Sequence, residues 1–434
     1  MLRTSLLYRA GIHLSLPLVP VVSLLDGKVR QGHRGRIGAL TRLRTWAATH
    51  RDPSRPLVWF HAPSVGEGLQ ARSVLARIRS RHPDWQVVYT HFSPSAEGFA
   101  RRVGADVAEY LPYDTGAAAE PVLDALKPTT IIFTKLDLWP EIATRAARCG
   151  LCVGLIAGTV RPRSSRLRWP ARQLLWPGYR VLQAAGAIAE DDARRLERLG
   201  VRAEVIQVTG DPRFDSVVDV VNAVPAEEPL KRFGEGAVTM VAGSTWPGDE
   251  AVLLEAFARL RIRRPEARLI LVPHEPTPDH LAQVDRMAAA VGLHPPHRLS
   301  ASDGPQPFLV ADQVGVLAKL YGAGSMAYVG GGFHGAGLHS VLEPAAWGIP
   351  VVFGPRWEES RDASLLLEAG GGEALAELGA AESAEALESL WEDWMVNEIR
   401  RKAQGRKARN VVQAGLGAAD RSADLVEALV ARRA

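Results

Sequence analysis

Four short segments of the chain place chemically active side chains directly after an apolar run. In the first, His61, Ser64 and Glu67 lie in the turn His-Ala-Pro-Ser-Val-Gly-Glu, which follows the apolar stretch beginning at Leu57. A carboxylate there could accept a proton from an attacking hydroxyl group, which is the task of a general base. The same spacing also fits a capping box, in which Ser64 and Glu67 stabilise the start of the next helix. The residues alone leave both interpretations of Glu67 open.

The second and third segments have the same placement. Lys135, Asp137 and Glu141 surround a Trp-Pro pair after the apolar run 131–133, and a purely solvated surface would not need a lysine beside that run. The third segment, Ala-Gly-Ser-Thr-Trp around Ser244, is a turn of small residues after another apolar run. We predict that both segments follow strands and lead into helices.

The fourth segment, residues 330–344, is a glycine-rich loop that follows the apolar run 326–329. Backbone N–H groups at the start of a helix, unobstructed by side chains, form an anion site, and phosphate is the expected ligand. Glu343 would lie one turn inside that helix, where it could accept two hydrogen bonds from a ribose. A surface glutamate in a first helical turn is the alternative. A dinucleotide-binding loop fits less well, because its glycine offsets and its acid on the next strand are not met cleanly.

Short apolar runs alternate with helical stretches from residue 57 onward, which is typical of a parallel sheet with helices on both faces. Between two such sets, residues 221–236 carry the prolines and charges of a linker. We therefore predict two α/β domains with a central cleft, in which ligands bind at the carboxyl ends of the strands. The predicted strands span 57–61, 86–90, 130–134, 152–156 and 203–208 in the first domain and 238–242, 268–272, 307–310, 326–329 and 350–353 in the second.

Composition agrees with a folded protein of two domains. The chain has 434 residues, of which 47% are hydrophobic and 23% charged, so a largely disordered protein is excluded. A net charge of +4 is too small to argue for nucleic acid, and no nucleic-acid partner is expected. The two cysteines, Cys149 and Cys152, are interpreted as a turn from a helix to a strand rather than a redox site. His274, Glu275 and His280 are weak support for a metal, so no metal site is predicted.

The N-terminal segment combines an apolar run with a basic strip. Residues 11–25 are apolar but include two prolines, so the run is short for a bilayer span, which needs about 20 apolar residues. A cleavable signal peptide is disfavoured because no small-residue cleavage site follows. This pattern favours a monotopic membrane anchor in residues 1–45, with a solvated basic helix beside an apolar one as the alternative. The basic residues, which have Asp26 as the only acid among them, are Lys28, Arg30, His33, Arg34, Arg36, Arg42 and Arg44.

Nine segments, taken in order and spacing, resemble motifs of the 3-deoxy-D-manno-octulosonic acid (Kdo) transferases of lipopolysaccharide synthesis. They are spread over most of the chain, and their combination is far more specific than any one of them. The matching segments are 59–67, 136–140, 210–215, 242–247, 271–275, 315–317, 320–321, 330–344 and 348–355.

The resemblance implies a GT-B fold of two Rossmann-like domains, with residues 46–222 binding the acceptor and residues 223–434 binding the CMP-sugar. It implies an inverting transfer of Kdo from CMP-Kdo to the lipid A precursor lipid IVA, at the cytoplasmic face of the inner membrane, with no cofactor and no catalytic metal. By this resemblance Glu67 is the general base. The implied donor contacts are Ser244, His274, Gly315, Gly331, Gly332, Ser340 and Glu343, and the implied acceptor or sugar contacts are His61, Ser64, Lys135 and Asp137.

The chain departs from the family pattern at three places. Many members have Val-Pro-Arg-His where residues 272–275 are Val-Pro-His-Glu, and His-Asn where residues 339–340 are His-Ser. The acidic segment Glu-x-Glu-Leu-Trp-Pro has a lysine first here, so Lys135 would pair either with the Kdo carboxylate or with Asp137.

Two other functions remain open at this point. One is a GT-B transferase or epimerase that uses another nucleotide sugar and would need the same glycine loop. The other is a non-catalytic protein that binds a sugar nucleotide at the membrane. The intact Glu67 favours an enzyme over the non-catalytic protein.

Overall fold

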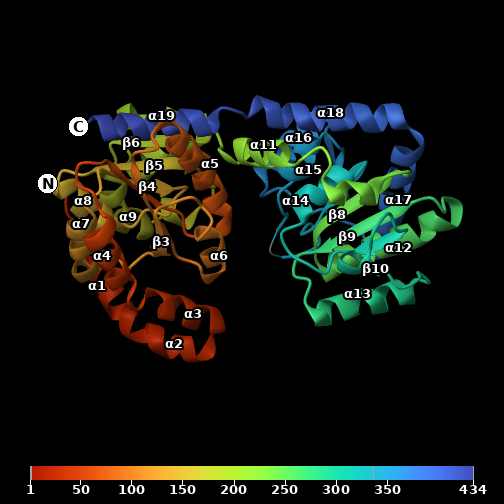
Figure 1. The fold of residues 1–434 in the computed structure, drawn as a ribbon, viewed down its shortest axis with the longest axis horizontal. Helices are drawn as coiled ribbons and strands as arrows, with labels where there is room; N and C mark the ends of the chain where they lie inside the picture. The colour runs from red at the N-terminus through yellow and green to blue at the C-terminus, as the bar shows by residue number, and fades with distance from the viewer. Residues whose placement is uncertain (1, 336, 434) are drawn as a thin grey trace. The chain divides into compact units, whose positions relative to one another are not determined.

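The computed structural model describes residues 2–335 and 337–433, which divide into two compact units (Figure 1). The first unit comprises Met1–Ser216 together with Gly415–Ala434, and the second comprises Val217–Ala414. Each unit contains one seven-stranded sheet, and the paired strands run parallel. The predicted α/β class with two parallel sheets is therefore confirmed.

The sheet of the first unit has the strand order β3-β2-β1-β4-β5-β6-β7. Its central strands are continuous buried runs because helices cover both faces. Two strands, β1 and β4, have the predicted bounds residue for residue. The strands are β1 (Leu57–His61), β2 (Gln86–His91), β3 (Val107–Tyr110), β4 (Thr130–Thr134), β5 (Cys152–Gly158), β6 (Ala184–Ala187) and β7 (Ile206–Val208).

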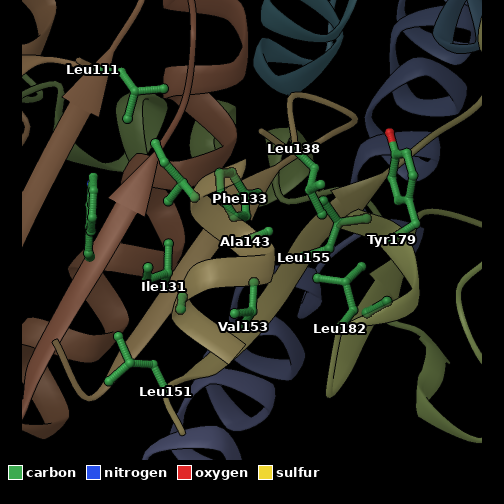
Figure 2. Packing of buried hydrophobic residues seen from close by; sticks show 14 of the residues in the cluster. Leu111, Ile131, Phe133, Leu138, Ala143, Leu151, Val153, Leu155, Tyr179 and Leu182 are labelled. Carbon is green, nitrogen blue, oxygen red and sulfur yellow. The ribbon is translucent and has the colours of Figure 1, made fainter. Parts of the chain in front are cut away.

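Successive side chains of a strand point to opposite faces, so each central strand contributes to two cores. Ile131 and Phe133 belong to one cluster, which Figure 2 shows with side chains of β4, β5 and α8 packed together, whereas Phe60 and Ile132 belong to the other. The helices of this unit are α4 (Ala39–His50), α5 (Val65–Arg81), α6 (Glu97–Ala100), α7 (Gly116–Leu126), α8 (Pro140–Arg148), α9 (Ala171–Arg180), α10 (Glu190–Leu199) and α19 (Ala418–Ala431).

The C-terminal helix α19 packs on the first unit, although the sequence analysis placed it in the second domain. Its apolar side chains join the cluster that contains Phe60 and Ile132, and α19 lies against α5 and β5 (Figure 1). The division also falls after Ser216 instead of residue 222, inside α11 (Arg213–Ala223). Both differences arise because an amphipathic helix belongs to the unit whose sheet buries its apolar face. The sequence of the helix does not specify which sheet that is.

The sheet of the second unit has the strand order β10-β11-β9-β8-β12-β13-β14. Its strands are β8 (Thr239–Thr245), β9 (Arg268–Pro273), β10 (His297–Arg298), β11 (Phe308–Val310), β12 (Met326–Val329), β13 (Val351–Phe353) and β14 (Gly372–Ala374). Its helices are α12 (Pro247–Arg263), α13 (Pro278–Ala290), α14 (Leu317–Leu320), α15 (Leu342–Trp347), α16 (Arg361–Glu368), α17 (Ala380–Val396) and α18 (Glu398–Ala414).

The N-terminal residues form α1 (Leu6–Ser15), α2 (Val19–Leu25) and α3 (Gly27–Arg36), and α2 lies beside α3 (Figure 1). The run Leu6–Leu25 is 20 residues long and is apolar enough to cross a membrane by length and composition. It is longer than the sequence pattern indicated, because the helix begins at Leu6 and a short 3₁₀ turn at Leu16–Leu18 carries it past Pro17. Only 6% of this run is buried.

Candidate active site

Glu67 lies in the first turn of α5, directly after the carboxyl end of β1. Its Oε1 accepts a hydrogen bond from Lys135 Nζ at 2.9 Å, and its Oε2 accepts one from the Ser64 hydroxyl. Ser64 occupies the N-cap position, but its side chain makes no capping hydrogen bond to α5. The capping-box interpretation is therefore wrong, because the hydroxyl group contacts the carboxylate of Glu67 instead of a backbone N–H.

These contacts hold Glu67 in its ionised form. Burial raises the pKa of Glu67, but the charge of Lys135 and the hydrogen bonds from Ser64 and Lys135 outweigh burial, so the pKa lies below its ordinary value. The Glu67 side chain is 16% exposed and the Lys135 side chain 45% exposed. Lys135 pairs with Glu67 and not with Asp137, the partner considered from the sequence. An ionised, partly accessible carboxylate is what a general base requires.

The backbone around Lys135 is held in an unusual conformation. Lys135 follows β4 with a φ of 63°, in the left-handed region that costs a non-glycine residue roughly 1 kcal/mol. Its N–H donates to the Ile156 carbonyl at 2.9 Å. The next carbonyl, of Leu136, accepts hydrogen bonds from the Tyr179 hydroxyl at 3.0 Å and from Arg166. Surrounding structure therefore stabilises the strained turn, as is common at functional sites.

A chain of hydrogen bonds connects the sheet core to Asp137. Trp59 Nε1 donates to Thr90 Oγ1 at 2.9 Å, Thr90 Oγ1 lies 3.0 Å from His61 Nδ1, and His61 Nε2 lies 3.1 Å from Asp137 Oδ2. The Thr90 hydroxyl also donates to the Phe60 carbonyl at 3.4 Å, and Trp139 Nε1 donates to His61 Nε2 at 3.2 Å. Trp139 Nε1 also donates to Asp137 Oδ2 at 3.1 Å. His61 is fully buried and Asp137 is 24% exposed, so His61 positions Asp137 and only Asp137 reaches solvent.

In the second unit, an aromatic cluster follows β8 and β9. The Trp246 ring stacks on His334, with centroids 4.1 Å apart, and on His274, with centroids 4.7 Å apart. Trp246 Nε1 donates to His339 Nε2 at 3.1 Å, so that nitrogen carries no proton. Burial and the nearby His274 and His334 lower the pKa of His339 to about 4. Ser244 precedes this cluster in a left-handed conformation with a φ of 54°.

A buried aspartate that the sequence analysis missed holds the glycine loop in place. Asp249 accepts hydrogen bonds from Gly331 N–H and the Tyr328 hydroxyl, both at 2.9 Å, from Trp246 N–H at 3.0 Å and from Phe333 N–H at 3.4 Å. Burial raises the pKa of Asp249 in spite of these donors. The N–H of Gly331, which was predicted to contact the donor, therefore binds an internal carboxylate. Gly331 has a φ of 97°, which favours glycine at this turn.

The other predicted donor residues follow strands of the same sheet. A Cβ on Gly332 would lie 2.5 Å from the backbone of Gly354, so a larger residue would push the two loops apart. Ser340 is exposed, and Glu343 is partly buried in the first turn of α15, where burial raises its pKa to about 7. Gly315 lies in an exposed turn between β11 and α14. Because parallel strands end at one edge, these residues share the carboxyl edge with Ser244 and His274.

His280, which the sequence analysis considered together with His274 and Glu275 for a metal site, has other partners. His280 Nδ1 lies 2.9 Å from the Glu275 carbonyl, and its Nε2 lies 3.0 Å from Glu250 Oε2, a buried carboxylate in α12. Among the described residues, no three His, Cys, Asp or Glu side chains gather as metal ligands. Asp249 and Glu250 could have been noticed in the sequence, because acids two and three residues after Pro247 mark a helix start.

Comparison with known proteins finds similar sequences along most of the chain. Residues 34–216 match the family model described as 3-Deoxy-D-manno-octulosonic-acid transferase (kdotransferase). A 3-deoxy-D-manno-octulosonic acid transferase of Bordetella pertussis is 28% identical over 422 residues, which cover 92% of this chain and 93% of that protein. The protein of the same name from Chlamydophila psittaci is 28% identical over 327 residues, 73% of this chain and 74% of the relative.

A solved structure shows the same architecture. UDP-GlcNAc 2-epimerase from Neisseria meningitidis, bound to UDP-GlcNAc, superposes with a TM-score of 0.61 over 87% of this chain and all of that chain, at 12% identity. At this identity the similarity shows the fold alone, which is the GT-B type of two Rossmann-like domains. Together with the family model and the relatives, it agrees with the motifs read from the sequence. The chain is therefore similar to the Kdo transferases, which are glycosyltransferases, over most of its length.

Proposed function

We propose that this protein transfers Kdo from CMP-Kdo to the lipid A precursor lipid IVA with inversion, and that Glu67 is the general base. The observation that carries the proposal is the Glu67 carboxylate itself. It lies at the carboxyl end of β1, is kept ionised by Lys135 and Ser64, and is partly accessible. The base removes the proton from the acceptor hydroxyl while that oxygen attacks the ketosidic carbon of the donor and CMP departs.

Lys135 and Asp137 are the second element of the proposed reaction. Both follow β4, and the Lys135 ammonium is 45% exposed while it contacts Glu67. Kdo is a sugar acid, and we assign its carboxylate to Lys135, because an ammonium group is a strong partner for a carboxylate. Asp137, held by His61 and Trp139, is partly exposed and can accept a hydrogen bond from a sugar hydroxyl.

The donor nucleotide is assigned to the carboxyl edge of the second unit. Trp246 and the histidines around it provide ring faces and N–H donors, and Ser244 and Ser340 provide hydroxyl groups. The solvent-exposed Ser340 stands where many family members have an asparagine, and both side chains donate to phosphate or ribose oxygens.

We assign the protein to the cytoplasmic face of the inner membrane through its N-terminal helices. The exposed apolar side chains of α1 and α2 include Leu6, Leu14 and Leu25, which are 79%, 75% and 88% exposed. Such side chains are stabilised by burial at the boundary of headgroups and acyl chains, and the basic residues of α3 are attracted to anionic headgroups. This placement presents the carboxyl edge of the first sheet to an acceptor that is itself a lipid.

The decisive experiment measures Kdo transfer by Glu67→Gln with CMP-Kdo and lipid IVA. Loss of the base is expected to reduce kcat by roughly 10² to 10⁴, with the affinity for CMP unchanged in calorimetry. Glu190→Gln is the matched control, because Glu190 is also a first-turn glutamate after a strand of this unit. Near-normal transfer by Glu67→Gln would remove Glu67 from the mechanism. Turnover of another nucleotide sugar without Kdo transfer by the wild type would favour a different GT-B enzyme.

A further inference from the structure

The loop that follows β5 carries an exposed tryptophan among arginines. Trp169 is 78% exposed, which is uncommon for so large an apolar side chain. Arg163, Arg168 and Arg172 are exposed beside it in the sequence. The chain has no Asp or Glu between Glu141 and Glu190, a stretch that contains eight arginines. Residues 159–172, named here the basic–aromatic loop, therefore present positive charge and an indole ring to solvent with no acid in the loop.

The base of this loop is attached to the candidate active site. Arg166 donates to the Leu136 carbonyl and lies 3.9 Å from Asp137, and Leu167 is buried in the core that contains Ile131 and Phe133. The 3₁₀ turn η3 (Ser165–Leu167) contacts both α9 and α10. The loop is therefore anchored at its centre, while Trp169 and the arginine side chains on either side of η3 stay exposed.

The loop also adjoins the N-terminal anchor. Helix α9 begins at Ala171, so the last two residues of the loop lie in its first turn, and α9 lies against α1. On α9, Trp176 is 37% exposed, and on α1, Leu7 is 75% exposed. Exposed apolar side chains thus occur on the loop, on α9 and on α1. The loop leads into α9, and α9 contacts α1.

The order of the strands in the first sheet places Glu67 and Lys135 between the N-terminal helices and the basic–aromatic loop. The α3 end of the anchor reaches the carboxyl end of β2, where Arg36 stacks 3.6 Å above the Phe92 ring and donates to the Phe92 carbonyl at 2.7 Å. The basic–aromatic loop follows β5. Strands β1 and β4, which end at Glu67 and Lys135, lie between β2 and β5 in the sheet.

We propose that the basic–aromatic loop is a second membrane-contact element, in which Trp169 inserts at the headgroup level and Arg163, Arg168 and Arg172 bind the phosphates of anionic phospholipids. The proposal rests on the membrane association in the proposed function and adds a contact on the other side of the site. Tryptophan prefers the bilayer interface because its ring is apolar and its N–H is polar. Arginine binds phosphate oxygens through its fork of N–H donors. Two contacts on either side of Glu67 would hold the active edge against the bilayer that contains the acceptor.

The test is vesicle co-sedimentation of the full-length protein on phosphatidylcholine vesicles with and without phosphatidylglycerol. The variant Arg163→Ala/Arg168→Ala/Arg172→Ala is expected to bind vesicles with phosphatidylglycerol on the order of 100-fold more weakly than the wild type, because each basic residue near an anionic surface contributes about fivefold. Binding to pure phosphatidylcholine should remain unchanged, since the apolar anchor is intact. The variant Trp169→Ala should weaken binding to both kinds of vesicle several-fold.

The matched control is Arg102→Ala/Arg198→Ala/Arg286→Ala, which removes the same charge from exposed positions elsewhere. If the loop variant and this control bind anionic vesicles equally, net charge alone acts and the proposal is overturned. Unchanged binding by the loop variant would overturn it as well. Thermal unfolding checks that each variant folds, and transfer to a detergent-solubilised acceptor should stay near the wild-type rate. Absence of Kdo transfer by the wild type would contradict the proposed function while leaving the vesicle result to stand by itself.

Discussion

At the residue scale, the most consequential feature is the ion pair between Lys135 and Glu67. Lysine replaces the first acid of the Glu-x-Glu-Leu-Trp-Pro pattern, and the structure places its ammonium 2.9 Å from the carboxylate proposed as the base. The pair holds Glu67 ionised at low pH but weakens it as a base. In the proposed function, an anionic sugar that draws Lys135 away would make Glu67 more basic, which would couple donor binding to activation of the base.

The first prediction concerns Lys135→Met. Without the lysine, burial still raises the pKa of Glu67 while the largest opposing charge is gone, so the acid limb of the pH profile of kcat/KM should move to higher pH. The KM for the donor should rise by about tenfold, the effect of losing one charge-assisted hydrogen bond to the Kdo carboxylate. Lys135→Arg, which keeps the charge, should leave the acid limb near its original position. An unchanged acid limb in Lys135→Met would show that this ion pair does not tune the base.

The second prediction concerns Glu343, whose pKa burial raises to about 7 in the folded protein from about 4.5 in the unfolded chain. Between those values the folded state binds more protons than the unfolded state, so Glu343 lowers the free energy of unfolding as pH rises through this window. Glu343→Gln should therefore match the wild type near pH 4.5 and exceed its free energy of unfolding at pH 8 by up to about 3 kcal/mol. Urea unfolding at both pH values measures the difference. A constant difference at the two values would contradict the assignment.

At the element scale, α1 is fastened to the first unit by polar contacts as well as by packing. The Tyr8 hydroxyl donates to Asp114 Oδ2 at 2.8 Å, and Arg9 donates to both carboxylate oxygens of Glu141 at 2.9 and 3.1 Å. Asp114 also accepts from the N–H groups of Glu141 and Ile142 at the start of α8. One carboxylate thus connects α1 with α8, the helix that follows the Lys135 turn.

The third prediction is that Arg9→Ala loosens this attachment. Glu141 is buried and keeps Arg145 as a partner, so the loss should destabilise the docking of α1 by about 1 to 2 kcal/mol, less than for a buried charge left alone. Hydrogen–deuterium exchange of the α1 amides should then accelerate roughly tenfold, while exchange in β1 and β4 remains slow. Arg3→Ala removes an exposed charge from the same segment and should leave exchange as in the wild type.

At the scale of the whole molecule, the chain returns to its first unit at the end. Asp215 accepts hydrogen bonds from the N–H groups of Gly417 and Ala419, which attaches the start of α19. Beyond that point, the apolar face of α19 is buried against β4, β5 and β6. The side chains of α19 in this core are Ala419, Ala423, Leu425, Val426, Leu429 and Val430. The two units are therefore linked by two chain crossings instead of one.

The fourth prediction follows from this connection. Deletion of residues 415–434 removes apolar burial worth on the order of 10 kcal/mol, comparable to the whole stability of a domain. The shortened chain should lose the cooperative thermal transition of the first unit and accumulate as aggregate. Deletion of residues 432–434 alone, which follow the end of α19, should leave the melting temperature within a few degrees of the wild type. A soluble, cooperatively folding chain that ends at residue 414 would show that α19 is dispensable.

Four strands were not predicted from the sequence, namely β3, β6, β10 and β14, and each is four residues long or shorter. Strand β6 consists of Ala-Ala-Gly-Ala, and β14 is three residues long, so neither has the β-branched or aromatic side chains that indicate a strand. These segments are strands because the neighbouring strands offer them hydrogen-bonding partners. By contrast, β12 and the Cys149–Cys152 turn were predicted correctly, because an apolar run after a helix end is a local signal.

The sequence by itself determined the alternation of strands and helices and the positions of Glu67 and the glycine loop after strands, since each depends on residues close together in the chain. Only the tertiary structure decided which side chains and backbone groups bind one another. Lys135 reaches Glu67 from 68 residues away, and Asp249 reaches Gly331 from 82 residues away. Which charge meets which carboxylate depends on the order of strands in the sheet, and local spacing carries no information about that order.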